Sequence, residues 1–148
     1  MNWKKEKEYY EIRLESIGGL GANLCGKMLG EMGLKYLDLN SSSFSSYGSE
    51  KTGTPVKGYV RYSKKEKEIR VHFPVVNPDL LVIFHEALIR DESVWKGCHK
   101  DTIVVLAVDS VKDSQRETPE AALKSLLPLS LKANQDIPEK VYLVEAQQ

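Results

Sequence analysis

Two glycine-rich segments carry the groups through which this sequence could bind an anion or a partner. The first is a turn at residues 17–23, which follows an expected strand, opens an expected helix and contains Gly18, Gly19 and Gly21. Its free backbone N–H groups and the helix dipole would point into one spot. That geometry serves an anion, or it simply lets the strand and the helix pack closely. The function depends on which use is real.

The second segment is a polar loop at residues 47–55, with the sequence Tyr47-Gly48-Ser49-Glu50-Lys51-Thr52-Gly53-Thr54-Pro55. It offers hydroxyls, one carboxylate and one ammonium group. No glycine-lysine-hydroxyl triplet opens a helix here, so the loop is not a Walker A motif. We prefer a docking loop to an ordinary surface loop, because long polar loops in compact domains are often functional.

A nucleotide site is the alternative use of the first turn. Gly19 and Gly21 supply two of the three glycines of a dinucleotide-binding fingerprint, but Leu24 occupies the third position. Asp38 lies near the offset expected for an acid that binds the ribose. The partial match keeps open a nucleotide-binding enzyme or sensor that uses Gly19, Gly21 and Asp38.

The histidines and cysteines show no spacing typical of a metal site. His85 is a better candidate than His72 or His99, because it ends an expected buried strand and strand ends face the ligand crevice in open α/β sheets. A merely hydrogen-bonded histidine is the simpler interpretation. Cys25 and Cys98 are too few for an iron–sulfur cluster, which usually takes four thiolates. We predict no catalytic residue and no metal ligand.

Length and composition indicate one ordinary globular domain over residues 1–148. The 148 residues include 41% hydrophobic and 28% charged side chains, and the 21 basic and 21 acidic residues cancel. No net field would attract nucleic acid or an anionic membrane. No apolar run approaches the ~20 residues of a membrane span. The charged first residues do not form a signal peptide, so we expect a cytoplasmic protein.

The apolar patterns predict strands that alternate with helices. We expect strands at 8–17, 35–39, 56–63, 69–73, 80–84, 102–108 and 141–144. We expect helices at 21–32, 86–96 and around 121–127, the last opened by Thr118, Pro119 and Glu120. The segments 56–63 and 69–73 would pair as a hairpin, and residues 40–53 would form a long polar loop. The order predicts a three-layer α/β/α sandwich with a mixed, mostly parallel sheet.

The first helix should bury one apolar stripe and approach the sheet closely at its glycines. The stripe consists of Leu24, Cys25, Met28, Leu29 and Met32. Gly26 and Gly30 would share a face that allows close approach, and Gly33 would suit the C-terminal cap.

Four segments, in their order and spacing, resemble the gamma subunit of 2-oxoacid:ferredoxin oxidoreductases. They are Gly-Gly-Leu-Gly at 18–21, Tyr-Gly-Ser-Glu-Lys-Thr-Gly-Thr-Pro-Val at 47–56, Val-Arg-Tyr-Ser at 60–63 and Pro-Asp-Leu-Leu at 78–81. The sequence departs from the family pattern at Leu20, Thr52 and Thr54, where the family has glutamine, arginine and glycine. The family usually continues through further helices after the last strand.

The resemblance implies a non-catalytic gamma-type subunit of a thiamine-dependent enzyme that converts a 2-oxoacid such as pyruvate to an acyl-CoA and passes electrons to ferredoxin. Thiamine diphosphate, iron–sulfur clusters and coenzyme A would belong to the assembly, with no cofactor held by this chain alone. The partners would be thiamine-binding and iron–sulfur subunits, with ferredoxin reached indirectly. A homodimer without these partners is a further possibility.

The motif positions carried over are Gly18, Gly19, Gly21, Tyr47, Gly48, Ser49, Glu50 and Gly53; Ser49, Glu50 and Lys51 would dock against partners. Both glycine-rich segments must then meet at one rim of the sheet.

Overall fold

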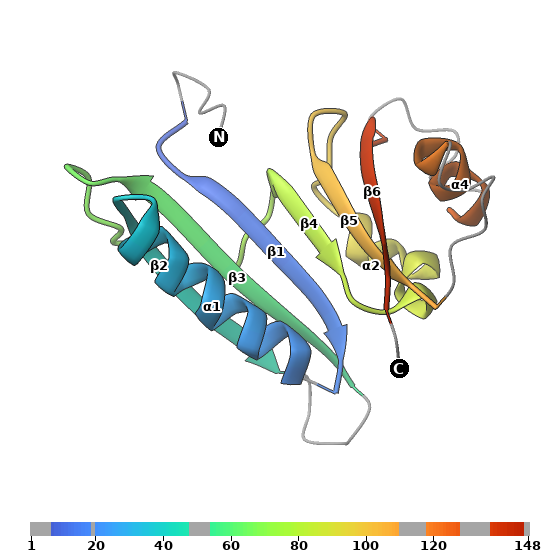
Figure 1. Cartoon of the computed structure of the whole chain (residues 1–148), viewed down its shortest axis with the longest axis horizontal. Coiled ribbons are helices and arrows are strands. Elements are labelled where there is room, and N and C mark those ends of the chain that lie inside the picture. Colours follow the sequence, from blue (N-terminus) through green and yellow to red (C-terminus); the bar gives the residue numbers. More distant parts are fainter. Residues whose placement is uncertain (1–6, 19, 48–53, 110–117, 128–136, 147–148) are drawn as a thin grey trace.

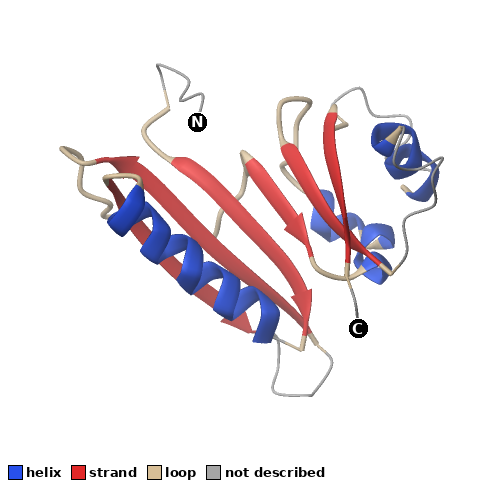
Figure 2. Ribbon diagram, viewed as in Figure 1, coloured by secondary structure: helices blue, strands red, loops and turns tan. Residues whose placement is uncertain are grey.

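The described residues form a six-stranded mixed sheet with helices packed on it (Figures 1 and 2). The computed structural model describes residues 7–18, 20–47, 54–109, 118–127 and 137–146. The strands are β1 (Tyr10–Ile17), β2 (Leu39–Tyr47), β3 (Pro55–Lys64), β4 (Leu80–Ile83), β5 (Ile103–Val108) and β6 (Lys140–Glu145). The helices are α1 (Leu20–Tyr36), the 3₁₀-helix η1 (Glu86–Arg90), α2 (Glu92–Trp95) and α4 (Pro119–Leu126).

The sheet has an antiparallel half and a parallel half that share β1. Its strand order is β2-β3-β1-β4-β5-β6. β3 pairs antiparallel with both β1 and β2, whereas β1–β4, β4–β5 and β5–β6 are parallel. The predicted α/β class and the mixed, mostly parallel sheet are therefore confirmed.

The helices lie on opposite faces of the two halves. In Figure 1, α1 lies on the near side of β2 and β3, with β1 beside it, and η1 and α2 lie behind the parallel strands. Alternate residues of β4 point to the two faces: Leu81 and Ile83 join the cluster with η1 and α2, and Leu80 and Val82 pack against the cluster under α1. The structure thus has two apolar cores on either side of one sheet.

The predicted second strand at 35–39 and the predicted loop at 40–53 are both wrong over much of their length. Helix α1 continues to Tyr36, and residues 39–47 form β2. A strand of serines is possible because β2 faces helical glycines: a Cβ on Gly30 would lie 3.2 Å from Ser43 Oγ. Small side chains fill this narrow space, so no apolar alternation is needed.

The predicted hairpin is also wrong, because residues 69–73 are not a strand and β3 takes β1 and β2 as its neighbours.

Residues 86–96 form η1 and α2 rather than one helix. They are separated at Asp91, whose Oδ1 accepts a hydrogen bond from Ser93 N at 2.9 Å. The last predicted helix and strand are confirmed as α4 and β6. Within the described residues no helix is long and apolar enough to cross a membrane.

The buried face of α1 differs from the predicted one. Leu24, Met28 and Met32 are 62%, 58% and 44% exposed. The helix packs on the sheet through small residues instead, namely Ala22, Gly26, Gly30 and Gly33. Gly33 is therefore a packing residue inside the helix and not its cap. Asp38, with φ 52°, adopts the left-handed conformation that follows the helix.

Candidate functional site

The two glycine-rich segments begin and end at one edge of the sheet. Gly18 N donates a hydrogen bond to Thr54 O at 3.3 Å, and Ile17 pairs with Pro55 in the β1–β3 register. Tyr47, which precedes the polar loop, pairs with Val56. The bases of both segments are thus side by side, as the docking interpretation requires. Gly19, Gly48, Ser49, Glu50, Lys51 and Gly53 lie outside the described residues.

The described glycines of the first turn serve different needs. Gly18 has φ +77°, and a Cβ there would meet nothing within 4 Å, so only its backbone conformation favours glycine. Gly21 allows close packing, because a Cβ there would lie 3.3 Å from the Phe84 ring and 3.8 Å from Ser16 Oγ. Close approach of helix and strand is therefore one real use of this turn.

Polar contacts hold the first turn of α1 against the end of β2. Asn23 Nδ2 donates to the hydroxyl of Tyr47, and Ser45 Oγ donates to Asn23 Oδ1. The Tyr47 side chain remains largely exposed at this edge. The sequence analysis gave Asn23 and Ser45 no role, because their contact joins α1 to β2 and residues 40–53 were predicted to be a loop.

His85 lies at the same edge, as expected from its place after β4. Its Nε2 is 3.5 Å from Ser16 Oγ, and its carbonyl accepts a hydrogen bond from Leu88 N at 3.0 Å where η1 begins. Phe84 N donates to Glu15 O at 2.9 Å, which fixes the end of β4 beside β1. Within the described ranges, no group of three His, Cys, Asp or Glu side chains could hold a metal ion. His85 is thus one of several polar groups at an edge.

Asp38 lies at the other end of α1 from Gly21. It follows the last turn of the helix, and its side chain pairs with Lys65 at the surface. A helix rises about 1.5 Å per residue, so about 20 Å separates this carboxylate from Gly21. The structure does not bring together the turn and the acid that the nucleotide hypothesis needs.

A buried row of charges lies on the face of the antiparallel half opposite α1, and the sequence analysis did not find it. Arg13 and Lys57 each approach Glu15 Oε1 at 3.2 Å. Burial is the main effect on the Glu15 carboxyl and raises its pKa, while the two cations act in the opposite direction. The Arg13 guanidinium donates to carbonyls at 2.6–3.4 Å, those of Val75, Val76, Val94 and Lys96. Arg13 therefore ties the segment before β4 and the C-terminal end of α2 to β1.

Arg61 is the largest fully buried side chain of this row. It is 1% exposed, its Nε donates to Glu11 Oε1 at 2.9 Å, and the Phe73 ring lies 4.9 Å from its Cζ. Nη1 and Nη2 have no hydrogen-bond partner among the described residues. In a strand, every second residue points to the same face. The alternation along β1 and β3 is therefore the sequence signal that could have placed these charged side chains on one face.

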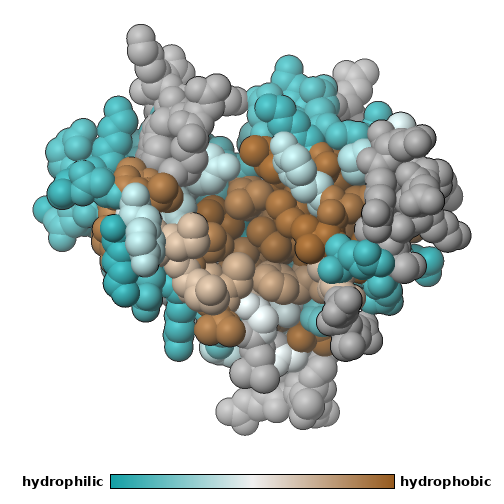
Figure 3. All heavy atoms as spheres, in the orientation of Figure 1, coloured by the Kyte–Doolittle hydropathy of each residue, from teal (hydrophilic) through white to brown (hydrophobic). Residues whose placement is uncertain are grey.

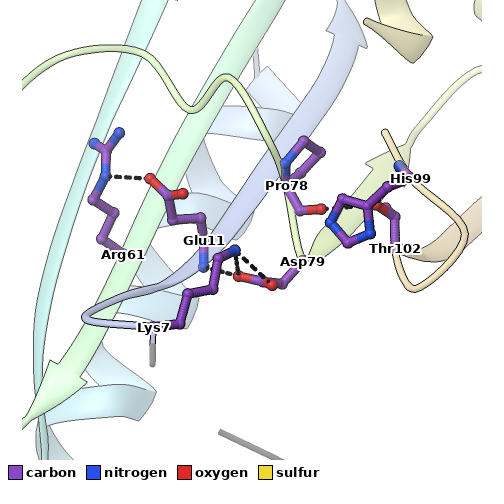
Figure 4. Close-up of polar contacts among 7 residues, drawn as sticks. All are labelled: Lys7, Glu11, Arg61, Pro78, Asp79, His99 and Thr102. Carbon is purple, nitrogen blue, oxygen red and sulfur yellow. Dashed lines mark hydrogen bonds and ion pairs between the residues drawn. The ribbon is translucent and has the colours of Figure 1, made fainter. Parts of the chain in front are cut away.

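Asp79 joins the starts of β1 and β4 at the opposite end of the sheet (Figure 4). Its carboxylate accepts from Lys7 Nζ at 2.7 Å and from Glu11 N at 2.8 Å, and its own N donates to Glu11 O at 2.8 Å. Thr102 Oγ1 donates to Pro78 O at 2.9 Å. The Pro-Asp pair at 78–79 thus has a structural role in strand alignment.

Comparison with known proteins identifies relatives of this fold and sequence. The sequence profile described as pyruvate ferredoxin/flavodoxin oxidoreductase matches residues 11–148. Pyruvate synthase subunit PorC of Thermotoga maritima is 36% identical over 110 residues, which cover 72% of this chain and 53% of that protein. The common gamma subunit of the pyruvate/ketoisovalerate oxidoreductases of Pyrococcus abyssi is 29% identical over 119 residues, 78% of this chain and 61% of that one.

Solved structures agree with the sequence matches. The crystal structure of the Thermotoga maritima pyruvate oxidoreductase subunit PORC superposes with a TM-score of 0.67 and 25% identity, covering 95% of this chain and 64% of that chain. The 2-oxoglutarate:ferredoxin oxidoreductase of Magnetococcus marinus, solved with 2-oxoglutarate, coenzyme A and succinyl-CoA, has a TM-score of 0.54 and 20% identity over 95% of this chain and 20% of its own, which shows the shared fold. The chain spans 53% and 61% of the lengths of the two curated relatives.

Proposed function

Because the chain belongs to the pyruvate ferredoxin/flavodoxin oxidoreductase family, we propose that it acts as a gamma-type subunit of a 2-oxoacid:ferredoxin oxidoreductase. In that assembly a 2-oxoacid is oxidatively decarboxylated to an acyl-CoA, and the electrons pass to ferredoxin. Thiamine diphosphate, bound by a partner subunit, supplies the chemistry of decarboxylation. This chain contributes binding and orientation rather than a reacting group.

The observation that carries the proposal is the meeting of the two glycine-rich segments at one edge. The Gly18–Thr54 hydrogen bond fixes the base of the polar loop beside the start of α1. Tyr47 is exposed there, and the charged residues Glu50 and Lys51 follow Tyr47 and precede Thr54 in the sequence. In this proposal the edge is the surface that docks against the thiamine-binding subunit.

The thiols of this chain do not fit an iron–sulfur cluster. The sequence contains two cysteines, whereas a cluster usually takes four thiolates. Burial raises the pKa of both thiols, that of Cys98 to about 11, which disfavours the thiolate form that ligates a metal. The clusters that pass electrons to ferredoxin would accordingly belong to partner chains.

Charge reversal in the polar loop tests the docking edge. Glu50→Lys or Lys51→Glu should weaken association with the co-expressed thiamine-binding subunit at least tenfold, because a like-charge contact replaces a matched one. Lys65→Glu is the matched control, since Lys65 is exposed at the other end of the sheet, and it should leave association unchanged. Equal affinity for all four proteins would refute the assignment of the edge.

Two further measurements test the subunit role itself. Gentle purification from the native source should recover this chain together with thiamine-containing subunits, and recovery of the chain alone would count against the proposal. A thermal-shift screen with NAD, FAD and coenzyme A addresses the alternative. A dinucleotide that stabilises the protein and loses its effect in Asp38→Ala would favour direct nucleotide binding.

A further inference from the structure

Arg61 carries buried hydrogen-bond donors that the fold does not use. Figure 3 shows the side of the sheet on which α1 lies, where brown and tan atoms extend across β4 and β5. Tyr62 faces that side, because its hydroxyl donates to Leu29 O of α1, so the Arg61 side chain belongs to the opposite side. It is 1% exposed, yet Nη1 and Nη2 have no hydrogen-bond partner among the described residues. Charged donors that stay buried and unpaired are costly, which points to a ligand or a bound water.

The unused donors form one defined edge of the guanidinium group. Nε is already engaged, because it donates to Glu11 Oε1 at 2.9 Å. Figure 4 shows both Nη groups directed away from that carboxylate. A guanidinium group binds a carboxylate with two parallel hydrogen bonds, either through Nε and one Nη or through both Nη groups. At Arg61 the second arrangement is the one left open.

Two residue pairs of β2 and β3 define the surroundings of Arg61 on this side of the sheet. Ser42 pairs with Arg61 in the β2–β3 register, and residues in such pairs have Cβ atoms about 5 Å apart. The next pair that points the same way is Phe44 and Tyr59, whose ring centroids are 5.0 Å apart. Arg61 thus has a hydroxyl group on one neighbour and an aromatic pair beside it.

Phe73 covers Arg61 but is not held firmly in place. The Arg61 Cζ lies 4.9 Å from the centroid of the Phe73 ring, and the Phe73 side chain is itself 57% exposed. Within the described ranges, no backbone–backbone hydrogen bond involves residues 68–74. The ring can therefore move aside without breaking the sheet, and this movement would admit a small ligand to the guanidinium group.

We propose that Arg61 is the centre of a binding site for a small free carboxylate, which Nη1 and Nη2 bind beneath Phe73 with the Ser42 hydroxyl as a third donor. A carboxylate is planar and its two oxygens match the two Nη groups, while it adds a single charge near Glu11. Inorganic phosphate would add more negative charge near that carboxylate and is less favourable. Arg61 is six residues along β3 from Pro55, about 20 Å from the glycine-rich edge. The site is therefore separate from the proposed docking surface.

An NMR titration of the full chain with acetate tests the site. The arginines are labelled with nitrogen-15, and sodium acetate is compared with sodium chloride at equal ionic strength and neutral pH. The Nη–H signals of Arg61, assigned through nuclear Overhauser contacts with the Phe73 ring, should shift saturably with acetate and not with chloride. The signals of the exposed Arg70 should show no saturable shift. Acetamide, which has the same shape without the charge, should bind about tenfold more weakly.

Substitutions assign the binding to Arg61 through the melting temperature. Acetate at ten times its dissociation constant should raise the Tm of the unchanged chain by about 3 °C. Arg61→Met should abolish this shift, and Arg70→Met, the same change at an exposed arginine, should retain it. Ser42→Ala removes only the hydroxyl and should weaken acetate binding about threefold. The Ser42 variant and the NMR titration keep the proposal testable if Arg61→Met does not fold.

Three results would overturn the proposal. If the Arg61 signals respond equally to acetate and to chloride, bound water satisfies the Nη groups and no carboxylate site exists. A Tm shift that persists in Arg61→Met would place the effect of acetate elsewhere. Binding of inorganic phosphate, or of an aspartate blocked at both ends, as tightly as acetate would contradict the assignment to a small free carboxylate.

Discussion

The glycines on the inner side of α1 allow one substitution to be tested with opposite expected signs at two positions. Replacing Gly by Ala within a helix gains about 1 kcal/mol of helix propensity. At Gly26 the added Cβ would lie 3.6 Å from Leu14 Cδ1, an ordinary van der Waals contact. Gly26→Ala should therefore raise the free energy of unfolding by about 0.5–1 kcal/mol.

Gly33→Ala should have the opposite effect. The Cβ would lie 2.5 Å from Cε1 and 2.8 Å from Cδ1 of Tyr62. That ring cannot move freely, because it is buried and its hydroxyl donates to Leu29 O at 2.5 Å. Overpacking at such a site costs about 3 kcal/mol, and the propensity gain offsets about 1, so the free energy of unfolding should fall by about 2 kcal/mol.

Urea unfolding followed by circular dichroism measures both variants. A double-mutant cycle assigns the cause: in a Tyr62→Val background, Gly33→Ala should no longer destabilise, because the ring atoms that it meets are gone. If Gly26→Ala and Gly33→Ala shift stability in the same direction, or if the penalty persists without the ring, the packing explanation of α1 is wrong.

Two further substitutions and one labelling experiment test groups away from α1. Asp79→Ala should lower the free energy of unfolding by about 2 kcal/mol in urea melts, since it removes charged hydrogen bonds to Glu11 N and to a lysine; a change below about 0.5 kcal/mol would contradict that role. Arg13→Lys should lower the free energy of unfolding by about 3 kcal/mol, because one ammonium group cannot bind all the carbonyls that the guanidinium group reaches from two nitrogens. An unchanged urea midpoint would refute this. Burial raises the pKa of the Cys98 thiol to about 11. In a Cys25→Ser background, iodoacetamide should therefore react with Cys98 at pH 8 about 100-fold more slowly than with a free thiol, and the rate should increase up to about pH 11. Fast labelling at pH 8 would argue against burial of Cys98. The same raised pKa means that the neutral thiol contributes to the free energy of unfolding below about pH 9, and this contribution is lost as pH rises through 11.

The sequence predicted best those elements whose patterns arise from their own packing. β4 and β5 are short apolar runs because they lie inside a parallel sheet, and such runs are recognisable without a partner. The close approach of Gly26 and Gly30 to the sheet was also predicted correctly. The edge position of His85 followed from the general geometry of strand ends.

The errors share a physical cause, which is packing decided by a distant segment. β2 is strand-forming because Gly30 and Gly33 leave room for Ser41 and Ser43, and a serine run carries no such signal by itself. The apolar stripe that includes Leu24 has the helical period. The period alone does not show whether another element of the structure packs against that stripe. Asn23 and Arg61 likewise gained their roles only through residues far along the chain.

The central position of β1 has a consequence for how the protein unfolds. Tyr10–Ile17 pair with β3 along one side, and Ile12–Glu15 pair with β4 along the other. Neither half can separate from the sheet without breaking backbone bonds of this strand, so the halves should melt in one cooperative transition. Amide protons of Ile12 and Leu14, which belong to the buried core under α1, should exchange with deuterium only when the whole molecule opens.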